Sequence, residues 1–211
     1  MITRWALRFS FESPPILQGD LHLDAVLLAL ATQAGIPYED AVRALPIRQE
    51  DGIFRCSRLL WDGEPDVQEI CMQRSVWEPT GLDMHRVTAD KPFTKNDRQK
   101  NFKVLMDRYS SMDIPVGYFL AETEDPDALL SAVQGIPALG KGSRKGYGVI
   151  GRVEMEATEQ DPWVQRDGRP ARALPVELWN ARFGGEHALS MQVVSPPYWK
   201  NDAQLCAVES I

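Results

Sequence analysis

Two kinds of hydrophobic spacing alternate along the chain and predict a mixed α+β protein. Residues 5–11 alternate large apolar side chains with small or polar ones, which is the period-two pattern of a strand. Residues 21–34 repeat apolar side chains every three or four positions, which predicts a helix that begins after an N-cap at Asp20 and ends at Gly35. The same criteria predict strands at 53–61 and 67–74 joined as a hairpin, a strand at 115–122, a helix at 125–134 and a strand at 149–156.

The order of these elements predicts a ferredoxin-like domain. Regular alternation is lost over residues 82–113, which we expect to be an insertion, either a protruding hairpin or a short helix. Without it the order approximates a β-α-β-β-α-β unit, in which two helices cover one sheet face and leave the other available for RNA. After the last strand of this unit the sequence shows a weaker β-rich pattern, which includes a stretch at 172–179 and is interrupted by turn signals. We expect a ferredoxin-like domain at 1–157 and a small β-rich lobe at 158–211.

Composition narrows the class of protein. With 44% hydrophobic and 25% charged residues among 211, the chain is typical of a globular protein. Its longest apolar run, at 25–31, is far shorter than the roughly 20 residues that span a bilayer, so we expect a cytoplasmic protein without a membrane partner. The cysteines Cys56, Cys71 and Cys206 are widely spaced, so we expect three buried thiols, no metal site and no cofactor.

The charge is uneven along the chain. The net charge of −7 argues against a protein that coats nucleic acid over its whole surface. Residues 86–108, however, hold seven cations and three acids, and residues 138–152 hold four cations and no acid. Two basic segments could therefore meet a polyanion while the acidic remainder faces solvent or protein partners.

A glycine-rich basic segment at 140–148 is the strongest chemical signal. Its glycines permit positive φ and a close approach of backbone to another chain, and its cations suit phosphate. A nucleotide-triphosphate loop is disfavoured because Gly142 stands where the magnesium-binding hydroxyl belongs, and a dinucleotide loop because Lys145 replaces the third glycine. We expect the segment to bind RNA through Gly140, Lys141, Gly142, Ser143, Arg144, Lys145, Gly146 and Tyr147.

Residues 136–150, a glycine-rich basic loop between a second helix and a last strand, resemble the RAMP superfamily of CRISPR-associated proteins. The first-helix stretch at 21–28 fits the same superfamily. The length, the Arg-x-Leu-Pro element at Arg172 and the Pro-Pro-Tyr-Trp that ends at Trp199 resemble most the small five-group subunit of type IV CRISPR effector complexes.

This resemblance implies a non-catalytic subunit that holds the 5′ handle of the CRISPR guide RNA and contacts the backbone and large subunits. Loop cations would bind phosphates, Tyr147 would stack on a base, and His22 is a further candidate RNA contact. Target DNA is a candidate second ligand. Candidate guide or target contacts in the basic insertion are Lys91, Lys95, Arg98, Lys100, Lys103 and Arg108.

Two other functions stay open at this point. Related RAMP proteins cleave precursor guide RNA, and histidine favours acid–base work at neutral pH, so His22, His85 and His187 are candidates. His22 lies beside apolar helix positions, where a structural role or an RNA contact is the stronger interpretation. The third option is a protein-interaction or metabolic protein without nucleic acid, in which the glycine segment is only a tight turn.

Overall fold

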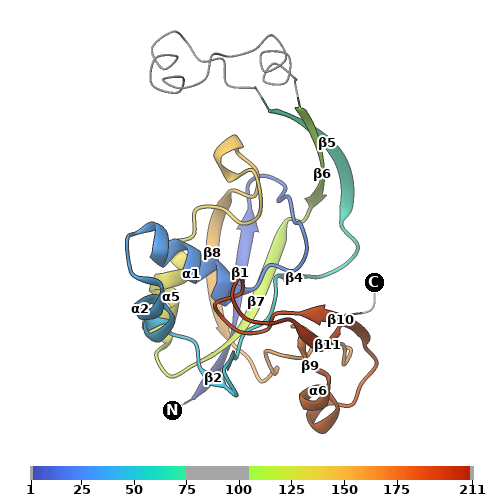
Figure 1. Ribbon diagram of the computed structural model, residues 1–211. Helices are drawn as coiled ribbons and strands as arrows, with labels where there is room; N and C mark the ends of the chain where they lie inside the picture. The colour runs from blue at the N-terminus through green and yellow to red at the C-terminus, as the bar shows by residue number, and fades with distance from the viewer. Residues whose placement is uncertain (1, 75–104, 210–211) are drawn as a thin grey trace, which may run out of the picture. The chain divides into compact units, whose positions relative to one another are not determined.

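A four-stranded antiparallel sheet in the order β4-β7-β1-β8 forms the centre of the fold (Figure 1). The computed structural model describes residues 2–74 and 105–209. In sequence the sheet strands and their helices follow as β1 (Thr3–Phe11), α1 (Leu23–Gln33), β4 (Leu60–Trp61), β7 (Val116–Thr123), α5 (Pro126–Gln134) and β8 (Ile150–Ala157). This β-α-β-β-α-β order with β1 and β7 in the middle is the ferredoxin-like arrangement, so the predicted fold class is confirmed.

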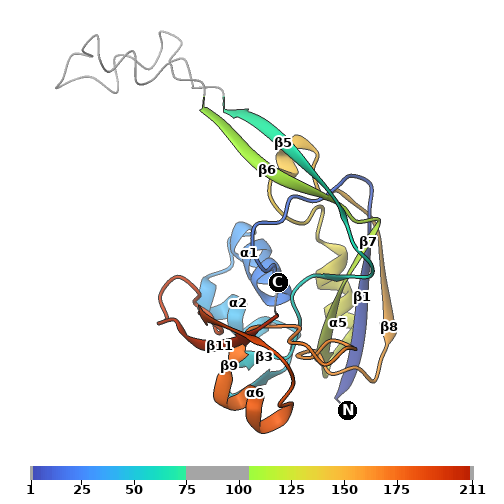
Figure 2. The ribbon, with the colours of Figure 1, turned by 90° about the vertical axis from the view of Figure 1, so that its right-hand side faces the viewer.

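The main core lies between the sheet and the helices α1 and α5, as Figures 1 and 2 show. Leu7 and Phe9 of β1 are fully buried, and the Phe9 ring meets Phe119 of β7 edge to face at 5.6 Å. Leu27 of α1 and Leu129 of α5 pack into the same cluster. The alternation that predicted β1 therefore marks its helix-covered face.

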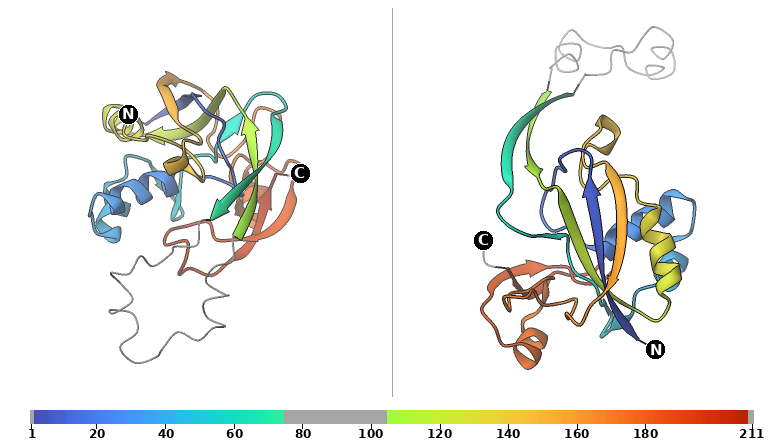
Figure 3. Two further views of the ribbon diagram at one scale, coloured as in Figure 1. Left: turned by 90° about the horizontal axis from the view of Figure 1, so that it is seen from above. Right: turned by 180° about the vertical axis from the view of Figure 1, so that it is seen from behind.

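The opposite face of the sheet is only partly open. Alternation places Ala6 and Arg8 of β1 on it, and Ala6 is buried with Leu60, Leu120 and Ala171. Seen from behind, β7, β1 and β8 lie side by side as the green, blue and orange strands (Figure 3, right). The expectation of a free face holds for only part of this surface.

Additional elements complete the main unit. Between α1 and β4 lie α2 (Tyr38–Ala44), β2 (Gln49–Glu50) and β3 (Ile53–Phe54), and the last two pair with each other. The C-terminal part holds a sheet in the order β10-β11-β9, packed around the buried rings of Trp163 and Trp179. Its elements are β9 (Leu174–Pro175), α6 (Val176–Arg182), β10 (Ala188–Gln192) and β11 (Gln204–Val208).

Three local predictions are wrong. The segments 53–61 and 67–74 do not pair as a hairpin, because the backbone of the first bonds elsewhere: Ser57 donates to the Leu120 carbonyl and Leu59 to that of Leu21. The α1 helix begins after His22, which makes no side-chain cap bond, rather than after Asp20. The stretch at 172–179 turns from strand to helix after Pro175.

A second unit comprises Val67–Ser111. It contains most of β5 (Asp66–Arg74) and β6 (Leu105–Asp113), which pair with each other. Most of the predicted insertion at 82–113 lies outside the described residues, and the predicted boundary at residue 157 stays a prediction. Cys71 on β5 is exposed, whereas Cys56 and Cys206 are buried, so the expectation of three buried thiols is wrong for Cys71. Among the described helices, none combines the length and the apolar character needed to cross a membrane.

Candidate nucleic-acid interface

The glycine segment forms a loop built on left-handed backbone turns. Gly140, Gly142, Gly146 and Gly148 all have positive φ, between 64° and 87°. Between the middle pair, a single turn of 3-10 helix, η1 (Ser143–Lys145), is closed by the Lys145 amide donating to the Gly142 carbonyl at 2.8 Å. Only glycine adopts this backbone at low cost, so the spacing of the glycines encodes the loop shape.

The connection after β1 holds this loop in place. The Lys141 amide donates to the Ile16 carbonyl at 2.8 Å, and the Gly148 amide donates to the Pro14 carbonyl at 3.1 Å. A Cβ at Gly140 would lie 2.5 Å from the Ile16 oxygen, and one at Gly148 would lie 1.9 Å from the Leu139 oxygen. These two glycines therefore serve contacts within the protein, which leave the loop preformed.

The side chains of the loop project a compact set of positive charges. Lys141, Arg144 and Lys145 are all exposed, and Tyr147 is half-buried. The Lys141 ammonium donates to the Gln18 side-chain oxygen at 3.0 Å. Within the described parts of the chain, neither Arg144 nor Lys145 forms an ion pair. The structure thus brings the predicted loop residues together, and the charges of Arg144 and Lys145 are available to an anion.

The other predicted basic segment is mostly outside the described residues. Lys91, Lys95, Arg98, Lys100 and Lys103 all fall within 75–104, and their assignment stays a prediction. Arg108 lies on β6 and pairs with Glu69 of β5 at 3.4 Å, with both side chains more than half exposed. An exposed pair of this kind contributes little to stability, so Arg108 can exchange its partner for a phosphate.

His22 has different surroundings from the loop. It stands at the start of α1 in a β-bridge with Arg58, and its ring atom Nδ1 is buried without a hydrogen-bond partner among the described residues, although other parts of the residue reach solvent. Burial and the neighbouring Arg172 lower the pKa of His22 to about 3, against an opposing effect of Asp24. The imidazole is therefore neutral at physiological pH, and any RNA contact it makes is not an ionic one.

A buried ion pair joins the first helix to the C-terminal part. Arg172 donates to both carboxylate oxygens of Asp24, at 2.9 and 3.1 Å, and neither residue is more than 1% exposed. Tyr198 donates to Asp24 and accepts from Arg172. Burial alone would raise the pKa of Asp24, but the Arg172 guanidinium lowers it to about 2. The first-helix stretch, the Arg-x-Leu-Pro element and the Pro-Pro-Tyr-Trp element thus meet at one structural network.

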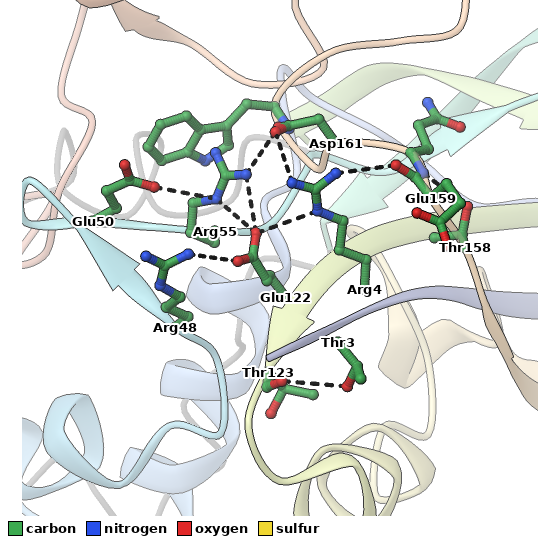
Figure 4. Close-up of polar contacts among 12 residues, drawn as sticks. Thr3, Arg4, Arg48, Glu50, Arg55, Glu122, Thr123, Thr158, Glu159 and Asp161 are labelled. Atoms are coloured by element: carbon green, nitrogen blue, oxygen red, sulfur yellow. Dashed lines mark hydrogen bonds and ion pairs between the residues drawn. The ribbon is translucent and has the colours of Figure 1, made fainter. Parts of the chain in front are cut away.

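Sequence reasoning missed a second polar network near the end of the central strand β7 (Figure 4). Glu122, only 2% exposed, accepts from Arg48 at 2.6 Å and from Arg55 at 3.0 Å, and pairs with Arg4 at 3.6 Å. Asp161 accepts from Arg55 at 2.6 Å and pairs with Arg4 at 3.7 Å. Because each carboxylate faces at least two guanidinium groups, we assign this cluster a structural role. The signal that could have revealed this network was the presence of charged residues in segments whose other residues are buried.

The comparison with protein families agrees with the sequence resemblance. The model of the family described as CRISPR type IV associated protein Csf3 matches residues 85–210, which are 126 of the 211 residues. A structural match, a chain of the cryo-EM structure of the Type III-B Cmr-beta bound to cognate target RNA, has a TM-score of 0.44 and 7% sequence identity. The match covers 74% of this chain and 61% of that chain. A comparison with curated proteins finds no significant match.

Proposed function

Because the chain belongs to the CRISPR type IV associated Csf3 family, we propose that it is a non-catalytic, RNA-binding subunit of a type IV effector complex. In this proposal the glycine loop holds the 5′ handle of the guide RNA. The observation that carries it is the preformed loop with the exposed cations Lys141, Arg144 and Lys145.

The loop geometry suits the backbone of unpaired RNA. The three cations follow one another within five residues, so they face neighbouring phosphates along a strand. Anchoring by Pro14 and Ile16 reduces the conformational freedom that binding would otherwise remove. Tyr147, half-buried beside the cations, supplies a ring on which a base can stack.

The remaining surfaces fit a subunit with protein neighbours. The net charge of −7 restricts the polyanion to the basic segments, and the acidic remainder faces partner subunits, which we propose to be the backbone and large subunits. The basic segment that includes Arg108 is assigned to the guide or to target DNA. No catalytic step is assigned to the chain; the lowered pKa of His22, about 3, makes its imidazole a weak base at neutral pH.

Coexpression tests the proposal. The chain is purified alone, and also with a CRISPR array and the other subunits, and the bound RNA is sequenced. We expect uncut guide RNA with one defined 5′ end to copurify, and the variant Lys141→Ala/Arg144→Ala/Lys145→Ala to lose most of it. Cleavage of the precursor by the chain alone would establish a nuclease instead. Absence of RNA from both preparations would overturn the RNA-binding role.

A further inference from the structure

A second candidate site lies on the partly open face of the sheet, away from the glycine loop. It is a cavity of about 310 Å³ between strands β4 and β7 and the chain segment at 165–169. Its volume falls at the lower end of the range of small-ligand sites, roughly 300–1,000 Å³. Two aromatic rings line it, Trp61 from β4 and Tyr118 from β7.

Both rings are braced by arginines. The Arg58 guanidinium lies 5.9 Å from the centre of the Trp61 ring, and the Arg8 guanidinium lies 5.6 Å from that of Tyr118. Such cation–π contacts hold each ring in place. Tyr118 also stands directly opposite Leu60 across the β4–β7 pairing, so the two strands present neighbouring positions to the cavity.

Most charged side chains in the cavity wall form ion pairs, and two do not. Arg58 and Arg169 both pair with Glu209, and Arg169 also pairs with Asp167 at 2.6 Å. Arg166 and Asp62 are exposed and form no ion pair within the residues that the structure describes. The cavity thus offers one free cation, one free carboxylate and two aromatic rings to a ligand.

We propose that this cavity binds one unpaired nucleotide. The base stacks on the Trp61 or Tyr118 ring, an N–H or amino group of the base donates to the Asp62 carboxylate, and the phosphate pairs with Arg166. Every nucleobase has a π face, and the bases carry such donors on their Watson–Crick edges, so the site takes nucleotides with little regard to sequence.

The site deepens the proposed function and rests on it for the origin of the strand. Arg152 on β8 and Val116 on β7 both pair with Ser10 of β1, and Arg8 pairs with Tyr118 two residues further along. Arg152 and Val116 are therefore separated by two strand spacings, about 10 Å. On this face Arg152 pairs with Glu154 at 2.6 Å and Arg8 pairs with Glu156 at 3.5 Å, so a single strand that runs from the glycine loop to the cavity replaces these carboxylates with its phosphates. The strand is either guide RNA or target DNA.

The test measures binding of fluorescent single-stranded oligo(A), as RNA and as DNA, of about eight nucleotides. Arg166→Gln and Tyr118→Leu are each expected to weaken binding about fivefold or more, and Arg166→Gln to flatten the log-affinity against log-salt slope by about 0.7. Arg43→Gln is the control, because Arg43 is an exposed arginine on α2 that pairs only with Asp40 of the same helix, and its replacement should leave affinity unchanged. The natural strand is of the same kind, RNA or DNA, as the probe whose binding weakens more in these two variants.

Asp62→Ala separates base binding from simple attraction of phosphate. Weaker binding supports a base held by the carboxylate, whereas tighter binding would overturn that placement, because removal of a negative charge favours a bare polyanion. If wild type binds the probes and the Arg166 and Tyr118 variants equal the Arg43 control, the cavity proposal is wrong and the loop proposal stands. If the cavity variants lose affinity while Lys141→Ala/Arg144→Ala/Lys145→Ala does not, the loop assignment fails and the cavity remains.

Discussion

Replacing Arg172 by methionine removes the cation that neutralises Asp24 in the interior of the main unit. Both side chains are at most 1% exposed, and the pair is bidentate at 2.9 and 3.1 Å. Loss of one partner leaves a buried charge uncompensated, which costs about 3–5 kcal/mol. Arg172 also donates to the Val194 carbonyl at 3.1 Å, so that acceptor loses a partner as well.

Urea denaturation followed by tryptophan fluorescence measures this loss. A decrease of 3–5 kcal/mol in the free energy of unfolding corresponds to a Tm lower by about 10 °C for a protein of this size. The matched control is Arg43→Met, which removes an exposed arginine paired only with Asp40 on the same helix and should change stability by less than about 0.5 kcal/mol.

The double variant Asp24→Leu/Arg172→Met distinguishes a coupled pair from two independent contributions. Because it removes both charges, we expect it to be more stable than the sum of the single variants predicts, by about 2 kcal/mol. Additive losses, or a loss below about 1 kcal/mol for Arg172→Met alone, would refute the assignment of this pair as the link between α1 and the C-terminal part.

Two further predictions concern His22 and the glycine loop. Because the pKa of His22 is lowered to about 3 in the folded protein against about 6.5 when unfolded, protons bind the unfolded state first, and the free energy of unfolding should fall by about 2 kcal/mol between about pH 7 and pH 5. His22→Gln should remove this part of the pH dependence, and an unchanged pH profile would show that the ring is accessible to protons in the folded state. Gly146→Ala should cost about 1 kcal/mol, since a Cβ there meets open space and only the positive φ is unfavourable. Gly148→Ala should cost clearly more, because its Cβ would lie 1.9 Å from the Leu139 oxygen, and equal stability of the two variants in urea denaturation would contradict the packing role of Gly148.

The fold was accessible from sequence where one periodic pattern covered a whole element. The strand around Leu7 and Phe9 and the helix ending at Gln134 both bury one regular face in the same core, so local spacing predicts them. The segment around Ser57 was misassigned because its burial indicates a strand while its backbone bonds go to the distant Leu120 and to Leu21. The strand with which a segment pairs depends on the assembled sheet, so a local sequence pattern does not predict it.

The candidate site was predictable in location but not in detail. Glycines and cations at 140–148 identify the loop, yet the sequence does not separate Gly148, which contacts the protein, from Gly146, which faces open space. The Asp24–Arg172 pair was beyond sequence reasoning because its members are 148 residues apart. Elements that carry a family resemblance can thus be structural even when the resemblance itself points to function.

The salt dependence of RNA binding tests the central claim most directly. Affinity for single-stranded guide RNA is measured over a series of salt concentrations for the wild type and for Lys141→Ala/Arg144→Ala/Lys145→Ala. If the three cations neutralise about three phosphates, the slope of log affinity against log salt should flatten by about 2 in the variant. Arg43→Ala, a single exposed arginine outside the loop, should leave the slope as it is in the wild type. An unchanged slope in the triple variant would contradict the assignment of this loop as the RNA-binding element.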